Sequence, residues 1–197
     1  MNLIKKRILL FETIKVENYE AQNLEFHLER VKNSIKKEPN FDFKHIIKAP
    51  NNGLFRAKVI YDENGDLIDC SLFSYKARKF RNFKILKSDV NYERKFLDRS
   101  ALDEIFAQRG SNDDVLIEKN RILTDTTIAN IAILQNNIWI TPKNPLLKGT
   151  IRQRLLNNSF LIERNFGIKE LLNAQSFAIL NAMIGFLEIK NAKFEIY

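Results

Sequence analysis

Hydrophobic and polar residues alternate along residues 8–19, ILLFETIKVENY, which predicts a strand with one buried face and a turn after it. The period changes in residues 23–37, where apolar side chains recur at the spacing of one helix face. These side chains are Leu24, Leu28, Val31 and Ile35. Asn23 precedes the run and is a residue type that caps helix starts. The pattern therefore predicts a strand followed by an amphipathic helix.

Two further strands are predicted in residues 54–78, on either side of the sequence DENGD. An Asn-Gly pair between two alternating segments is a strong signal for a β-hairpin. A short helix is predicted in the preceding segment, residues 39–50, which is bounded by prolines. Residues 1–80 are therefore predicted to form a small α+β lobe.

Residues 81–197 continue with a strand in 81–90 and a helix in 98–110, with Asp98 or Ser100 near its start. Shorter apolar runs separated by the turn signals EKN and QNN predict further strands. They are expected in residues 114–125, 128–134 and 138–142.

The last third of the chain is predicted to start with an amphipathic helix that follows Gly149 and continues through residue 164. Its apolar face would include Ile151, Leu155, Leu156 and Ile162. A short helix in residues 168–175 and strands in 176–197 would follow. The chain is therefore predicted to be an α+β protein of two lobes, residues 1–80 and 81–197.

The composition is that of a soluble globular protein, with 45% apolar and 28% charged residues. No apolar run approaches the roughly 20 residues that span a bilayer. The apolar stretch ILLF near the N-terminus is too short for a signal peptide. Cys70 is the single cysteine, which excludes an intramolecular disulfide and fits a reducing cytoplasm. We therefore expect a cytoplasmic protein without a membrane segment.

A net charge of +8 raises the question of a nucleic-acid partner. The basic residues are dispersed, however, and acidic residues are interleaved with them nearly everywhere. The densest basic runs, KNSIKKEP and YKARKFRNFKILK, lack the glycine-aromatic pattern of RNA-recognition modules. We expect no nucleic-acid partner. Some of the cations could instead serve an anionic cofactor or substrate.

Two segments of the C-terminal half could carry chemistry. Residues 149–152, GTIR, place a glycine and a threonine before a helix, where free backbone N–H groups can bind an anion. The alternative is an ordinary turn with Thr150 as the N-cap. Asp125 stands in a strand-like segment among threonines, and a buried carboxylate there would need a partner. The alternative is a turn aspartate that bonds its own backbone.

Two other candidates involve cations. His27 and Arg30 are three residues apart, so they would lie on neighbouring positions of one helix, and Arg30 could reach a phosphate or form a surface ion pair. Lys95 and Arg99 lie in the charged segment NYERKFLDRS. A lysine becomes a nucleophile only if its amine can lose its proton near neutral pH. Two scattered histidines and one cysteine make a dedicated metal site improbable, so none is predicted.

Taken in order, these segments resemble the class IV aminotransferase family, the pyridoxal-phosphate enzymes of fold type IV. LFETIKV is similar to an early FETIR-like strand, and HLERVKNS is similar to the HLxRLxxS helix. KFLDRSAL is similar to the KxLNRL segment that bears the cofactor lysine, best matched in 4-amino-4-deoxychorismate lyases. The segment from Asp113 to Leu134 resembles the strands that lead into an ExxxxN motif. TPKNPLLKGTIRQRLL is similar to the phosphate-binding TPxxxxLxGxxR loop, and ILNAMIGF to a late NALxP-like stretch.

The resemblance implies a role for each matching residue. Lys95 would bind pyridoxal 5'-phosphate covalently, with Lys87 as the competing candidate. Asp125 stands where the family usually has the glutamate that pairs with the pyridine nitrogen. The cofactor phosphate would be bound by Arg30, Thr150, Ile151, Asn181 and Ala182. Thr13 and Lys15 would contact the substrate.

The resemblance also implies a two-lobe fold, with a small N-terminal α/β lobe and a larger, β-barrel-like C-terminal lobe with helices. The implied activity is that of an aminodeoxychorismate lyase, which makes 4-aminobenzoate and pyruvate in folate biosynthesis, and family members are homodimers. The alternatives are an aminotransferase for branched-chain or D-amino acids and a relative that binds the cofactor without turnover.

Overall fold

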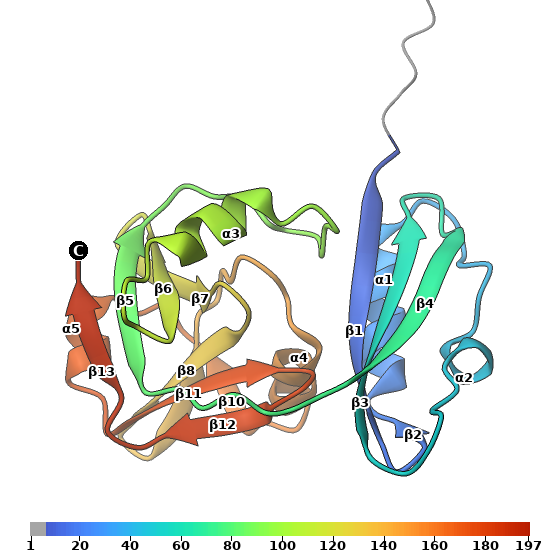
Figure 1. The fold of residues 1–197 in the computed structure, drawn as a ribbon. Helices are drawn as coiled ribbons and strands as arrows, with labels where there is room; N and C mark the ends of the chain where they lie inside the picture. The colour runs from blue at the N-terminus through green and yellow to red at the C-terminus, as the bar shows by residue number, and fades with distance from the viewer. Residues whose placement is uncertain (1–6) are drawn as a thin grey trace, which may run out of the picture. The chain divides into compact units, whose positions relative to one another are not determined.

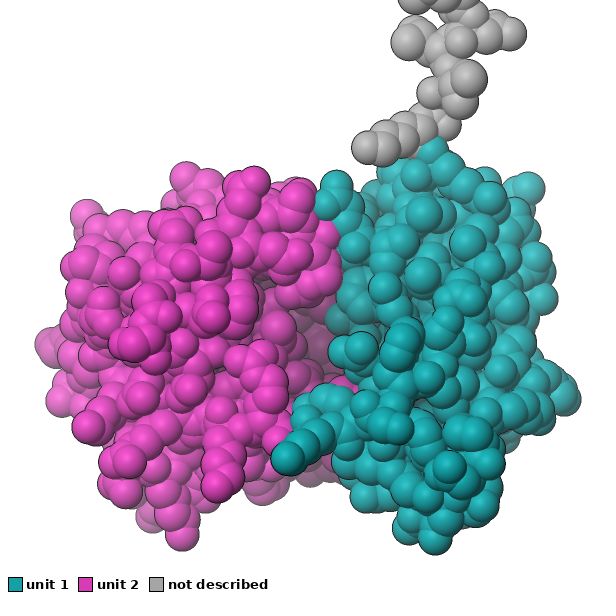
Figure 2. All heavy atoms as spheres, viewed as in Figure 1, with its two compact units in different colours: residues 1–76, 94–98 teal, residues 77–93, 99–197 magenta. Residues whose placement is uncertain are grey.

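The computed structural model describes residues 7–197, in which the chain forms two compact units (Figures 1 and 2). Unit 1 comprises the described residues up to Lys76 together with Arg94–Asp98. Unit 2 comprises Ala77–Glu93 and Arg99–Tyr197. The mixed α+β class predicted from the sequence is confirmed. The domain boundary at residue 80 stays a prediction.

Unit 1 contains a four-stranded antiparallel sheet in the order β2-β1-β3-β4. Its strands are β1 (Leu9–Glu17), β2 (Glu20–Ala21), β3 (Leu54–Asp62) and β4 (Leu67–Ser74), and its helices are α1 (Leu24–Ser34) and α2 (Phe43–Ile46). Both helices and the predicted hairpin of β3 and β4 are confirmed. Asn23 is the N-cap residue of α1, but its side chain makes no capping hydrogen bond.

The core of unit 1 forms on one face of β1 because alternate residues of a strand point to the same side. Leu10, Ile14 and Val16 are fully buried and pack with residues of α1, α2 and β3. Glu12 lies at the one remaining position of this alternating set and is also fully buried. A carboxylate therefore occupies an inward position of a hydrophobic strand face.

Residues 94–98 join unit 1 by pairing with β1. The Phe11 amide donates to the Lys95 carbonyl at 3.0 Å, and the Leu97 amide donates to the Leu9 carbonyl at 2.9 Å. Leu10 and Phe96 form an antiparallel bridge. The sequence prediction assigns residues 94–98 to the C-terminal lobe, whereas these contacts place them in unit 1.

Within the described residues, unit 2 contains a nine-stranded sheet whose main path is β10-β9-β8-β7-β6-β5-β13, with β11 and β12 attached through β8. The pairs β5–β6, β5–β13 and β9–β10 are parallel, and the remaining pairs are antiparallel. The strands are β5 (Asn82–Lys87), β6 (Asp114–Lys119), β7 (Ile122–Thr126), β8 (Asn130–Gln135), β9 (Ile138–Thr141), β10 (Leu161–Glu163), β11 (Ser176–Asn181), β12 (Gly185–Ile189) and β13 (Lys193–Ile196). The helices are α3 (Ser100–Ala107), α4 (Thr150–Asn157) and α5 (Ile168–Leu172).

The helix predicted to extend through residue 164 is wrong in its second half. Helix α4 ends at Asn157, and Ser159 adopts a left-handed conformation with φ of 57°. Asn and Ser favour helix ends because their side chains compete for backbone hydrogen bonds. Ile162 consequently lies on the short strand β10 and is 42% exposed, whereas Ile151 in the first turn of α4 is 2% exposed.

This difference predicts unequal effects of two identical truncations. Ile151→Ala should lower the free energy of unfolding by about 2–5 kcal/mol, because it leaves a cavity in a packed cluster. Ile162→Ala should change it by about 0.5 kcal/mol or less. Urea unfolding of the two variants measures both values. Equal losses would contradict the assignment of residue 162 to an exposed strand.

Candidate functional site

Lys95 in unit 1 is held on the edge of β1 rather than in a solvated helix start. Its carbonyl accepts the Phe11 amide, and its half-buried side chain places Nζ 4.5 Å from the centre of the Phe11 ring. An ammonium group is attracted by the face of an aromatic ring. Backbone pairing and the Phe11 ring together restrict the position of the Lys95 amine.

Glu12, His27 and Arg30 form a buried cluster in the same unit. Helix α1 places His27 and Arg30 three residues apart, and both side chains meet the carboxylate of Glu12 on β1. Arg30 Nε donates to Oε1 at 2.9 Å, and Arg30 Nη2 donates to Oε2 at 2.5 Å. His27 Nδ1 also lies 2.5 Å from Oε2. The sequence predicts that His27 and Arg30 lie on neighbouring positions of one helix, and the cluster is consistent with this prediction. The sequence analysis did not identify Glu12 as their shared partner.

The cluster fixes the protonation of its members. Burial alone would raise the pKa of Glu12, but the Arg30 charge and the hydrogen bond with His27 outweigh it and lower the pKa to about 2. Burial lowers the pKa of His27, against the opposing effect of Glu12, and the Arg30 and Lys95 charges lower it further. His27 is therefore neutral, and its Nδ1–H donates because an ionised carboxylate only accepts. Its buried Nε2, which has no hydrogen-bond partner among residues 7–197, then carries no proton.

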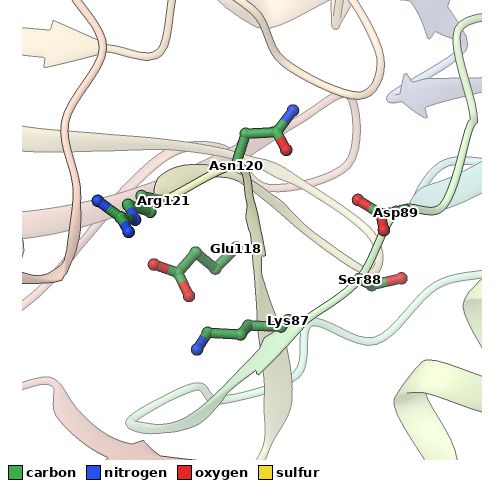
Figure 3. Close-up of a pocket in the computed structure, with 6 residues that line it drawn as sticks. All are labelled: Lys87, Ser88, Asp89, Glu118, Asn120 and Arg121. Atoms are coloured by element: carbon green, nitrogen blue, oxygen red, sulfur yellow. The ribbon is translucent and has the colours of Figure 1, made fainter.

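Lys87, the competing lysine, lies at the end of β5 in unit 2. Its Nζ lies 4.2 Å from the centre of the Tyr197 ring, and the Tyr197 hydroxyl lies 3.3 Å from Glu118 Oε2. Lys87 and Glu118 are among the residues that line a pocket of about 430 Å³ (Figure 3). The hydrogen bond with the Tyr197 side chain raises the pKa of Lys87. A raised pKa keeps the amine protonated, which is unfavourable for a nucleophile.

Asp125 in unit 2 is a buried carboxyl group held by two fixed donors. It lies on β7 and is 4% exposed. Asn130 Nδ2 donates to Oδ1 at 2.8 Å, and the Leu147 amide donates to Oδ2 at 2.9 Å. Asn130 Nδ2 also donates to the Leu147 carbonyl at 2.7 Å. Neither Asn130 nor Leu147 is a backbone neighbour of Asp125. Asp125 is therefore not a turn aspartate that bonds its own backbone, which was the alternative interpretation of the sequence.

Burial raises the pKa of Asp125 to about 7, although the Asn130 and Leu147 hydrogen bonds and the Arg152 charge act in the opposite direction. The group can therefore gain or lose its proton near neutral pH. A carboxyl group of this kind can share a proton with a basic ring nitrogen.

The start of α4 provides backbone donors in unit 2. Gly149 is the N-cap residue and supplies no side-chain cap, and Thr150 and Ile151 are the first, buried helical residues. Thr150 is thus not the N-cap. The first N–H groups of a helix have no partner within it and favour an anion. Arg152 follows, 1% exposed, with Nη2 bound to the Pro142 carbonyl at 2.8 Å and to Glu163 at 2.6 Å.

The remaining predicted residues have local roles in the described structure. Asn181 Oδ1 accepts the amides of Met183 and Ile184 at 2.9 and 3.0 Å, which fixes the turn that contains Ala182. Asn181 Nδ2 donates to the Ile128 carbonyl, two residues before Asn130. Thr13 and Lys15 lie on β1 at positions that alternate with the buried face, and Lys15 pairs with Glu17 at 2.8 Å.

The structure thus gathers the predicted residues into two sets. Unit 1 holds Lys95 and Arg30, and unit 2 holds Asp125 and the start of α4. The assigned binding roles stay predictions. Within residues 7–197, no three potential metal ligands cluster and no helix is long and apolar enough to cross a membrane.

Comparison with known proteins identifies the relatives of this chain. Residues 96–192 match the family model described as amino-transferase class IV. A protein of Haemophilus influenzae, named only as an uncharacterized protein, is 33% identical over 186 residues, which are 89% of this chain and 98% of that protein.

Two solved structures extend the comparison. A structure from Haemophilus somnus, named a "putative 4-amino-4-deoxychorismate lyase", is 33% identical with a TM-score of 0.82, covering 90% of this chain and 97% of that one. A pyridoxal-phosphate-bound aminotransferase from Mycobacterium tuberculosis, named as hypothetical, is 17% identical with a TM-score of 0.79, covering 95% and 81%. The second likeness shows the fold alone.

The contact between Gly149 and Asn130 predicts a coupled pair of substitutions. A Cβ atom at residue 149 would lie 1.9 Å from Asn130 Oδ1, so Gly149→Ala must displace the amide that holds Asp125. We expect Gly149→Ala to cost about 1–3 kcal/mol of unfolding free energy. In an Asn130→Ala background the same change should cost little, because the backbone at residue 149 suits any residue. If the losses of unfolding free energy caused by Gly149→Ala and Asn130→Ala simply add in the double variant, this contact is contradicted.

The raised pKa of Asp125 predicts a pH-dependent loss of stability. Between its ordinary value of 3.8 and about 7 the folded cofactor-free protein retains a proton that the unfolded chain releases. The free energy of unfolding contributed by this group therefore falls as pH rises through that range. Relative to Asp125→Asn, the wild-type protein should lose stability from pH 4 to pH 7 in urea unfolding. Parallel pH curves for the two proteins would show that Asp125 has an ordinary pKa.

Proposed function

Because this chain belongs to the class IV aminotransferase family, we propose that it is a pyridoxal-phosphate-dependent lyase that converts 4-amino-4-deoxychorismate to 4-aminobenzoate and pyruvate. The observation that carries the choice of reaction is the Haemophilus somnus structure, whose name gives this lyase and whose chain is covered over 97% of its length at 33% identity. The family match and the fold support an enzyme that uses pyridoxal phosphate.

The donor groups of the chain suit the chemical parts of this cofactor. A dianionic phosphate fits an arginine and the open start of a helix, which are Arg30 and the α4 residues Thr150 and Ile151. The loop of Asn181 and Ala182 is proposed as a further phosphate contact. A pyridine nitrogen fits the buried carboxyl of Asp125. An aldehyde fits the amine of Lys95. When bound, pyridoxal phosphate supplies an electron sink for carbanion chemistry.

Each residue then has a defined task. Lys95 would hold the cofactor through its amine and, once that amine is free, would move a proton at the substrate α-carbon or leaving group. Asp125 holds a proton at the ring nitrogen, and its pKa near neutrality suits a group that shares that proton. The Asn130 and Leu147 donors keep the Asp125 carboxyl at one position while it does so. Thr13 and Lys15 are proposed substrate contacts.

We also propose that the enzyme acts as a cytoplasmic homodimer in folate biosynthesis. Cys70 is the single cysteine of the chain, which suits a reducing compartment. Its thiol is half-buried, and burial and the charge of Asp69 raise its pKa.

Two assays on purified protein supplied with pyridoxal phosphate test the reaction. With 4-amino-4-deoxychorismate alone, we expect 4-aminobenzoate by fluorescence and an equal amount of pyruvate by coupled reduction. Lys95→Ala should lower the rate by about 10²–10⁴-fold, because it removes both nucleophile and proton carrier. Lys87→Ala, the matched control, should retain it.

Two other outcomes would overturn the lyase assignment. Turnover that needs both an amino acid donor and 2-oxoglutarate would identify an aminotransferase. Cofactor binding with no turnover of either kind would identify a relative that binds pyridoxal phosphate without catalysis.

A further inference from the structure

Glu12 is buried on a strand face that is otherwise hydrophobic, and nothing in the proposed reaction uses it. Its side chain is fully buried at an inward position of β1, on the same face as Leu10 and Ile14. An ionised carboxylate in such a place is costly unless it is paired and fully hydrogen-bonded. A hydrophobic residue would fill the position without that cost, which suggests that the charge has a use.

The partners of Glu12 determine what that use can be. Both carboxylate oxygens bind the guanidinium of Arg30, one through Nε and one through Nη2. The guanidinium is planar and rigid, so two contacts on one edge fix the orientation of its plane. His27, itself fully buried, donates from Nδ1 to the same carboxylate and keeps it from rotating. The Arg30 side chain is 13% exposed, so it lies at the margin of this buried cluster.

We propose that Glu12 and His27 are positioning residues that hold the Arg30 guanidinium in the orientation that binds the cofactor phosphate. The inference rests on the proposed function, in which Arg30 binds that phosphate. Two of the five N–H groups of the Arg30 guanidinium donate to Glu12. Because the guanidinium is planar, its other N–H groups point away from Glu12. Glu12 acts directly on Arg30, and His27 acts through Glu12.

A competing electrostatic effect has the opposite sign. The charge of Glu12 cancels part of the charge of Arg30, so its removal alone would strengthen attraction for a dianion. Loss of position should outweigh this gain. Without the Glu12 carboxylate, the guanidinium loses the two hydrogen bonds that fix its plane, so it no longer presents the same N–H groups to a phosphate. The sign of the measured change therefore distinguishes positioning from charge compensation.

The test compares binding of pyridoxal phosphate with binding of pyridoxal, which lacks only the phosphate. Both aldehydes react with the same lysine, so the ratio of their dissociation constants, measured by visible absorbance, reports the phosphate contacts alone. Glu12→Gln should reduce this preference for the phosphate form by about tenfold, because an oriented hydrogen bond to a charged group is lost. Asp62→Asn is the matched control, since it removes another buried carboxylate of unit 1, one that binds Arg7.

A pair of substitutions at His27 keeps the test informative if Glu12→Gln fails to fold. His27→Leu removes the donor to Glu12 and should also reduce the preference. His27→Asn places an amide N–H near the position of Nδ1 and should restore it.

The outcomes separate the two proposals. An unchanged or increased preference in Glu12→Gln, or equal values in the two His27 variants, would overturn the positioning role. A wild-type protein that binds neither aldehyde, or binds both equally, would instead overturn the proposed cofactor site.

Discussion

A carboxylate cannot be buried in either unit of this protein without fixed donors, and the two units meet that requirement differently. In unit 1, Glu12 is paired with the charge of Arg30, and its pKa falls to about 2, so it remains ionised. In unit 2, the hydrogen bonds to Asp125 come from neutral donors, among them Asn130 and Leu147, and burial raises its pKa to about 7. One carboxylate is therefore a permanent anchor, and the other can exchange a proton.

This difference supports the proposed role of each unit. In the proposal, Glu12 orients Arg30 towards the cofactor phosphate. The titratable carboxyl of Asp125 would share a proton with the ring nitrogen. Gly149 links the second function to the start of α4, because only a residue without Cβ leaves room for the Asn130 amide that holds Asp125. Asp125 is thus held in place by the Asn130 and Leu147 donors.

The local elements could be predicted from the sequence, but several contacts between distant residues could not. Alternation located β1, and the Asn-Gly pair located the hairpin of β3 and β4, because both signals lie within a few residues. The same alternation places Glu12 with Leu10 and Ile14, so a signal for the buried carboxylate was present and was missed. The end of α4 was misjudged because Ile162 happens to continue its apolar spacing. The pairing of Lys95 with Phe11, 84 residues away, leaves no periodic trace in the sequence.

We propose that Lys95, held on the edge of β1 beside Phe11, is the residue that binds pyridoxal phosphate. The most direct measurement is to incubate the protein with the cofactor, make the covalent link permanent with borohydride, and locate the added mass by peptide analysis. If Lys95 binds the cofactor, we expect a visible absorbance band that borohydride removes and a single adduct on Lys95. An adduct on Lys87, or no adduct at all, would contradict it.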